Sequence, residues 1–179
     1  MVKARSRAKA MSMDEKRMRE ICVFTLRTMK TAHPVPYGAL IVNTKTGKRL
    51  SRATNAVVRE NDPSAHAELR AVRLACKKLK RSSLAGYTMY STSEPCAMCM
   101  ANALWAGLDR LVFGATIADA CRHCVQVHVP AKEVARRADM ACVVDGPVLR
   151  EECCTLFTHP NMQRAFRTWS VGKRKPRKR

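Results

Sequence analysis

Apolar residues in the first part of the chain recur with the spacing of a helix. Between positions 11 and 30 they fall three or four residues apart, as in Met18, Ile21, Cys22 and Leu26. Acidic residues stand near the start of this stretch, where the helix dipole favours negative charge. The sequence HPVP at 33–36 then ends the helix, because a residue before proline avoids the helical region.

The rest of the chain alternates short apolar runs with helical patterns. Strands are predicted at 38–42, 50–58, 87–91, 111–114 and 125–129, the first two forming a hairpin around the turn Thr46-Gly47. Helices are predicted at 65–80, 96–106, 131–138, 149–157 and 162–169. Strands that alternate with helices in this way indicate an α/β fold with helices on both faces of a sheet.

Length and charge place this pattern in one basic domain. The chain has 179 residues, with 34 Lys and Arg against 14 Asp and Glu, which gives a formal net charge of +20. We expect one domain over 11–170, flanked by basic disordered tails at 1–10 and 171–179. The sequence KRKPRKR fills 173–179. Such tails are typical either of contact with nucleic acid or of a solvated end, and both interpretations stay open.

Three features bear on where the protein works. No run of about 18 apolar residues is present, so no membrane span and no membrane partner are expected. The basic N-terminal stretch is not followed by an apolar one, so it does not have the pattern of a secretory signal. The nine cysteines are odd in number, which favours reduced thiols in the cytoplasm over a secreted disulfide framework.

The chemistry is concentrated in two segments that each open a predicted helix. Cys96 and Cys99 lie three positions apart, so both thiolates can face one ion, and His66 can supply a third ligand from another helix start. Zinc accepts this mixture, and we expect one Zn²⁺ per chain. Three protein ligands leave a position for water. Glu68 lies two residues after His66, where it can move protons for that water.

These residues form the pattern H-x-E…P-C-x-x-C, which is similar to that of the cytidine-deaminase-like superfamily. The segments NDPSAHAE at 61–68 and EPCAMC at 94–99 resemble the branch of guanine deaminases and tRNA adenosine deaminases. The resemblance implies a three-layer α/β/α fold with a mixed five-stranded sheet, a homodimer, and hydrolytic release of ammonia from a base. It also implies that the substrate contacts Asn55, the backbone of Ala67, and Trp105, with the turn 36–38 shaping the pocket.

The substrate stays open between alternatives. The helix around Trp105 resembles that of guanine deaminases, so a purine base or nucleoside is favoured, guanine first. The charge of +20, and a likeness of 146–157 to tRNA deaminases, support adenosine in tRNA instead. A third alternative is a basic RNA-binding module with structural zinc and no catalysis.

A second cysteine pair adds one more alternative. Cys121 and Cys124 follow the first pair closely enough to suggest a four-cysteine zinc ribbon, but the predicted helix and strand between the pairs oppose it. Their role, and that of His123 between them, is not assigned by the sequence.

Overall fold

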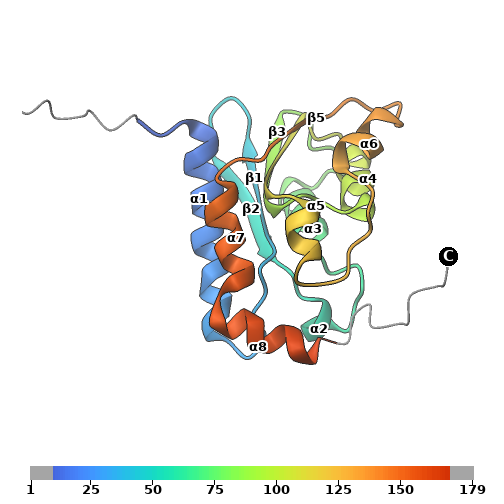
Figure 1. Cartoon of the computed structure of the whole chain (residues 1–179). Helices are drawn as coiled ribbons and strands as arrows, with labels where there is room; N and C mark the ends of the chain where they lie inside the picture. The colour runs from blue at the N-terminus through green and yellow to red at the C-terminus, as the bar shows by residue number, and fades with distance from the viewer. Residues whose placement is uncertain (1–9, 170–179) are drawn as a thin grey trace, which may run out of the picture.

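A mixed five-stranded sheet forms the centre of the protein (Figure 1). The computed structural model describes residues 10–169, so the predicted tails at 1–10 and 171–179 lie outside the described residues, apart from Ala10. The strand order is β2-β1-β3-β4-β5; β1 is antiparallel to β2 and β3, and β3, β4 and β5 are parallel. The strands are β1 (Gly38–Asn43), β2 (Arg49–Thr54), β3 (Tyr87–Ser93), β4 (Arg110–Ala115) and β5 (Val143–Asp145).

Helices cover both faces of this sheet, which confirms the predicted α/β class. One face is covered by α1 (Met13–Leu26) and α7 (Arg150–Thr158), with α8 (Pro160–Thr168) after them. The other face carries α3 (Ala67–Leu79), α4 (Ala97–Trp105) and α6 (Ala131–Arg136). Three short elements complete the described chain: η1 (Arg27–Lys30), α2 (Val57–Glu60) and α5 (Ile117–Cys121).

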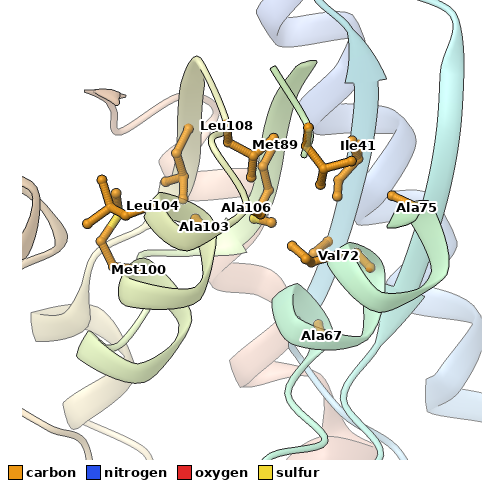
Figure 2. Close-up of a cluster of buried hydrophobic side chains, with 14 of the residues drawn as sticks. Ile41, Ala67, Val72, Ala75, Met89, Met100, Ala103, Leu104, Ala106 and Leu108 are labelled. Atoms are coloured by element: carbon orange, nitrogen blue, oxygen red, sulfur yellow. The ribbon is translucent and has the colours of Figure 1, made fainter. Parts of the chain in front are cut away.

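The two helical layers produce two apolar cores, because strand side chains alternate between the faces. In β1, Ile41 joins the core beneath α3 and α4, whereas Leu40 joins the core beneath α1 and α7. Figure 2 shows the first of these cores, which includes Val72 of α3, Leu104 of α4 and Met89 of β3. Each such buried side chain contributes about 1.5–3 kcal/mol to the free energy of folding.

The second core requires a glycine in β4. A Cβ on Gly114 would overlap the Cys153 side chain of α7 and crowd the carbonyl of Thr92. Glycine therefore allows α7 to approach the sheet at β4. The neighbouring strand β3, which contains Thr92, borders the candidate site.

The fifth strand is not where the sequence pattern predicted it. The alternation of valines at 125–129 predicted a strand, but these residues form no strand and Val125 and Val127 are 67% and 55% exposed. Alternation alone was misleading here, because no neighbouring strand pairs with the segment. The sheet is instead completed by β5 at Val143–Asp145. The strand predicted at 50–58 also ends earlier, at Thr54.

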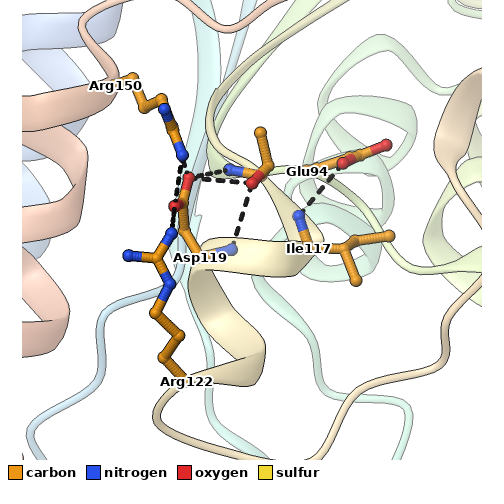
Figure 3. Close-up of polar contacts among 6 residues, drawn as sticks. Glu94, Ile117, Asp119, Arg122 and Arg150 are labelled. Atoms are coloured by element: carbon orange, nitrogen blue, oxygen red, sulfur yellow. Dashed lines mark hydrogen bonds and ion pairs between the residues drawn. The ribbon is translucent and has the colours of Figure 1, made fainter.

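A buried carboxylate fixes α5 against α7 (Figure 3). Asp119 accepts hydrogen bonds from Arg150 at 2.7 and 2.8 Å, from Arg122 at 2.7 Å, and from Thr116 at the start of α5. The bonds from the Arg150 guanidinium hold the pKa of Asp119 well below its usual range. This ion-pair network anchors the chain just before it turns toward the candidate site.

Within residues 10–169, no helix combines the length and the apolar character needed to cross a membrane.

Candidate functional site

The predicted metal ligands meet where two helices begin. His66 is the N-cap residue of α3, and Cys96 is the N-cap residue of α4, with Cys99 in the first turn of the same helix. Cys99 is buried, whereas His66 and Cys96 are partly accessible. The positive ends of two helix dipoles therefore converge on one point, which favours thiolate ligands there.

The spacing of the three ligand atoms fits a tetrahedral zinc ion. Cys96 Sγ lies 3.7 Å from Cys99 Sγ, and His66 Nδ1 lies 3.8 and 3.5 Å from these two sulfurs. Zn–S and Zn–N bonds in tetrahedral geometry require about 3.8 Å between sulfurs and about 3.6 Å between sulfur and nitrogen. Within residues 10–169, this is the only cluster of His, Cys, Asp and Glu side chains with metal-binding spacing.

The ligands influence one another's protonation. The hydrogen bond between Cys96 and Cys99 lowers the pKa of Cys96 to about 4 and raises the pKa of Cys99 well above its usual range. The hydrogen bond with Cys96 raises the pKa of His66. One thiolate is thus already favoured beside the imidazole before an ion is bound.

Glu68 lies beside the ligands without belonging to their cluster. Its side chain is 5% exposed, and Ser91 Oγ of β3 donates a 3.0 Å hydrogen bond to its Oε1. Its Oε2 lies 3.6 Å from Cys99 Sγ. Burial raises the pKa of the Glu68 carboxyl. A carboxyl group held in this way is placed to exchange protons with a molecule at the metal centre.

A pocket opens next to Glu68 and includes Asn55. The Asn55 Oδ1 accepts a 3.1 Å hydrogen bond from the backbone of Val57, which turns the amide so that its N–H groups are available to a ligand. Trp169 also lines this pocket, with its ring centroid 6.5 Å from that of Tyr37. The pocket is lined by Tyr37, Asn55, Val57, Val58, His66, Glu68, Glu94, Cys96, Val125, Gln126 and Trp169.

The other two predicted substrate contacts have different positions. Ala67 is buried at the first position of α3, where a backbone N–H has no acceptor within the helix. Trp105 is 80% exposed at the end of α4 and lines a separate apolar cavity with Val134 and Met140. It therefore lies outside the pocket of its own chain, and it is not a core residue either.

The second cysteine pair does not join the metal ligands. Cys121 lies 3.7 Å from His128 Nδ1, Cys124 lies 3.0 Å from the Tyr37 hydroxyl, and His123 stacks on Phe157 at 5.6 Å between ring centroids. The four-cysteine ribbon is therefore wrong, because the helix α4 and the strand β4 separate the two pairs.

Several pocket residues were not predicted from the sequence. Ser91 contacts Glu68 from β3, and Gln126 and Trp169 line the pocket from two later segments; none of these three belongs to a metal or catalytic motif. Glu94 lies in the segment EPCAMC, but no role was predicted for it. Only the position of Glu94, two residues before Cys96, was a local signal that could have drawn attention to it.

Three protein ligands beside a buried carboxylate are typical of catalytic zinc in a hydrolase, since structural zinc sites use four. Residues 11–115 match the family model described as the cytidine and deoxycytidylate deaminase zinc-binding region. This match covers more than half of the chain. The chain therefore belongs to that family of zinc-dependent deaminases. His66, Cys96 and Cys99 form the group that can hold its zinc.

Curated relatives carry two different names. A tRNA-specific adenosine deaminase of Buchnera aphidicola subsp. Baizongia pistaciae is 32% identical over 80% of this chain and 86% of its own length. A second, of Aquifex aeolicus, is 41% identical over 45% of this chain. The guanine deaminase of Bacillus subtilis is 40% identical over 48% of this chain. The last two matches span about half of those relatives, 52% and 53% of their lengths.

A solved structure supports the fold. A guanine deaminase from Nitrosomonas europaea superposes with a TM-score of 0.75, covering 92% of this chain and 90% of that one, at 21% sequence identity. The shared architecture is that of the deaminase fold, as the resemblance implied.

Proposed function

We propose that this protein removes an exocyclic amino group from a purine by hydrolysis, with guanine as the first candidate. The observation that carries this proposal is the position of Glu68, buried beside three ligand atoms that fit zinc and held by Ser91. When bound, zinc supplies Lewis acidity that makes an attacking water acidic near neutral pH. The remaining chemistry falls to residues of the chain.

Glu68 moves the proton in this mechanism. Water adds to the ring carbon that carries the amine, Glu68 takes its proton, and the carboxyl then gives that proton to the leaving nitrogen. The carbon–nitrogen bond breaks and ammonia leaves, so guanine becomes xanthine. Ser91 holds one carboxyl oxygen at 3.0 Å, which leaves the other oxygen to make the transfer.

The pocket walls support a flat, compact substrate. Asn55 offers its amide N–H groups to acceptors on the base, and Ala67 offers a backbone N–H from the first turn of α3. The Tyr37 and Trp169 rings provide aromatic surface at the rim. A free base occupies only the pocket, whereas an adenosine in tRNA also needs space for the strand on either side of it. A compact pocket therefore favours guanine.

Adenosine in tRNA is the second candidate, favoured by the charge. A net charge of +20 suits a polyanion, since each phosphate contact releases condensed counterions. Two of the relatives described above are named tRNA-specific adenosine deaminases.

A substrate panel separates the candidates. We expect the zinc-loaded protein to release ammonia from guanine faster than from guanosine, adenine, adenosine, cytosine or cytidine, because the amide donors of Asn55 and the aromatic surface of Tyr37 and Trp169 suit a free purine base with ring acceptors. The measurement is an ammonia assay on each compound, with inosine formation in tRNA measured in parallel.

The outcomes of this panel are distinct. Inosine in tRNA without xanthine from guanine would replace the first candidate with the second. No turnover on any substrate, together with salt-sensitive RNA binding, would contradict the deaminase proposal and leave the RNA-binding module.

We also propose that two copies associate through the face that carries Trp105. The exposed indole continues into an apolar cavity that includes Leu104, Val129 and Met140. Contiguous apolar surface of this kind marks an interaction site. A second copy of the chain is the occupant, in agreement with the homodimer that the resemblance implies.

Sedimentation velocity tests this association. We expect a dimer for the unmodified protein and a monomer for Trp105→Glu, because the substitution places a charge in an apolar contact. Val23→Glu is the matched control, since Val23 is also exposed but lies on α1, on the other face of the sheet. A monomeric unmodified protein, or a Trp105→Glu variant that remains dimeric, would contradict the proposed interface.

A further inference from the structure

The segment 117–131 returns from β4 to the pocket and is held at both ends by Glu94. Glu94 Oε2 accepts a 3.1 Å hydrogen bond from the backbone of Ile117, and its Oε1 accepts one of 3.0 Å from Ala131 (Figure 3 shows the former). Glu94 lies two residues before Cys96. The segment is thus fixed relative to the metal ligands, and the Asp119 ion pairs hold its first turn as well.

Within this segment, Gln126 reaches into the pocket as part of a three-residue network. Its Nε2 donates hydrogen bonds to the Tyr37 hydroxyl at 2.9 Å and to Cys124 Sγ at 3.3 Å. Tyr37 and Cys124 are themselves 3.0 Å apart. Gln126 and Tyr37 both line the pocket that contains His66 and Glu68.

The hydrogen bonds of this network have one consistent direction. Burial raises the pKa of Tyr37 and that of Cys124, so both groups keep their protons. Cys124 donates to the carbonyl of Ala120, which leaves its sulfur to accept from Tyr37 and Gln126. Gln126 Nε2 therefore donates to both groups, and no described residue donates to its carboxamide oxygen.

Gln126 and Asn55 are thus complementary. The Asn55 oxygen is occupied by the Val57 N–H, so Asn55 presents donors to the pocket. Gln126 presents an acceptor. Two amides of opposite polarity, each fixed by the protein, define which hydrogen-bonding pattern a ligand must carry.

We propose that Gln126 determines substrate specificity by accepting a hydrogen bond from a ring N–H of the purine. This inference rests on the proposed function and names the substrate class: purines that carry a ring N–H, as guanine does at N1 and in its imidazole ring. Adenosine has no ring N–H, because N1, N3 and N7 are acceptors and N9 carries the ribose. With adenosine, the acceptor of Gln126 would lose its partner, which a site rejects strongly.

Binding of guanine without turnover tests this role directly. In a Glu68→Gln background loaded with zinc, we expect Gln126→Met to raise the Kd for guanine about 10- to 100-fold, because methionine keeps the length but removes the acceptor. Gln126→Glu keeps an acceptor at this position and is expected to bind guanine more tightly than Gln126→Met. Isothermal titration calorimetry gives the Kd, and zinc content and Tm are measured for each variant.

Turnover and a matched control complete the experiment. With Glu68 intact, Gln126→Met is expected to raise KM for guanine more than it lowers kcat, and to reduce the preference for guanine over adenosine. Gln163→Met is the control. Gln163 lies on α8 and donates to the Phe157 carbonyl, outside the residues that line the pocket. It is expected to bind guanine as the unmodified protein does.

Each outcome has one meaning. An unchanged guanine Kd in Gln126→Met, or an equal loss in Gln163→Met, would overturn the role of Gln126 even if guanine is deaminated. Guanine binding that depends on Gln126, without ammonia release from the unmodified protein, would support this role and overturn the proposed function. Failure of guanine both to bind and to react would overturn both.

Discussion

The Glu68→Gln variant is expected to deaminate about 10²- to 10⁴-fold more slowly than the unmodified protein, while its zinc remains bound. Glutamine preserves the shape of the side chain, and its amide oxygen can still accept the hydrogen bond from Ser91. It cannot accept a proton from water and return it to the leaving nitrogen. The loss therefore falls on kcat, measured by ammonia release under saturating substrate, with zinc content measured on the same sample.

Glu152→Gln is a suitable control for this experiment. Glu152 pairs with Arg19 at the surface, so its loss is expected to leave the rate unchanged. Full activity in Glu68→Gln would contradict the proton-transfer role. Loss of zinc from that variant would instead place Glu68 among the metal ligands.

Cys99→Ser is expected to lower the zinc content from about one ion per chain to near zero and to abolish turnover. Cys99 is buried and lies 3.5 Å from His66 Nδ1 and 3.7 Å from Cys96 Sγ. A serine hydroxyl is a poor replacement for a thiolate at zinc. Because the ion stabilises the folded state to which it binds, Tm should fall as well. Metal analysis and thermal unfolding measure the two effects.

Cys121→Ser supplies the matched comparison for Cys99→Ser. Its thiol contacts His128 rather than the metal cluster. One ion per chain should therefore remain in this variant, together with its activity. A fall in zinc content on replacing Cys121, or full zinc retention in Cys99→Ser, would contradict the assignment of the ligands.

The helices and the metal ligands were the predictable parts of this protein. Cys96 and Cys99 lie one helical turn apart, and His66 opens another helix, so their relation depends on local geometry that a sequence pattern can express. The core strands were also found, because buried strands carry continuous apolar runs. In 125–129 the pattern was an alternation of valines with polar residues, and it failed because alternation does not reveal whether a pairing strand exists.

The pocket wall was not predictable for a different reason. Tyr37 and Gln126 are 89 positions apart in the sequence and meet only through the fold. Trp169 reaches the same rim from the end of α8. Trp105 is a different case: its helix resembles that of guanine deaminases and so suggested a substrate contact, whereas the side chain is exposed outside the pocket of its own chain. Such residues carry no local periodicity or spacing from which their neighbours can be inferred.

The hydrogen bonds of Glu94 have a consequence for how such an enzyme can change over generations. One carboxylate holds both ends of the segment that carries Gln126, while the next residues along the chain begin the helix with the zinc ligands. Substitutions between Ile117 and Ala131, whose backbone N–H groups bind Glu94, alter the wall of the pocket without moving the metal centre. The preference for one base over another can therefore be inherited and modified separately from the ability to remove an amine.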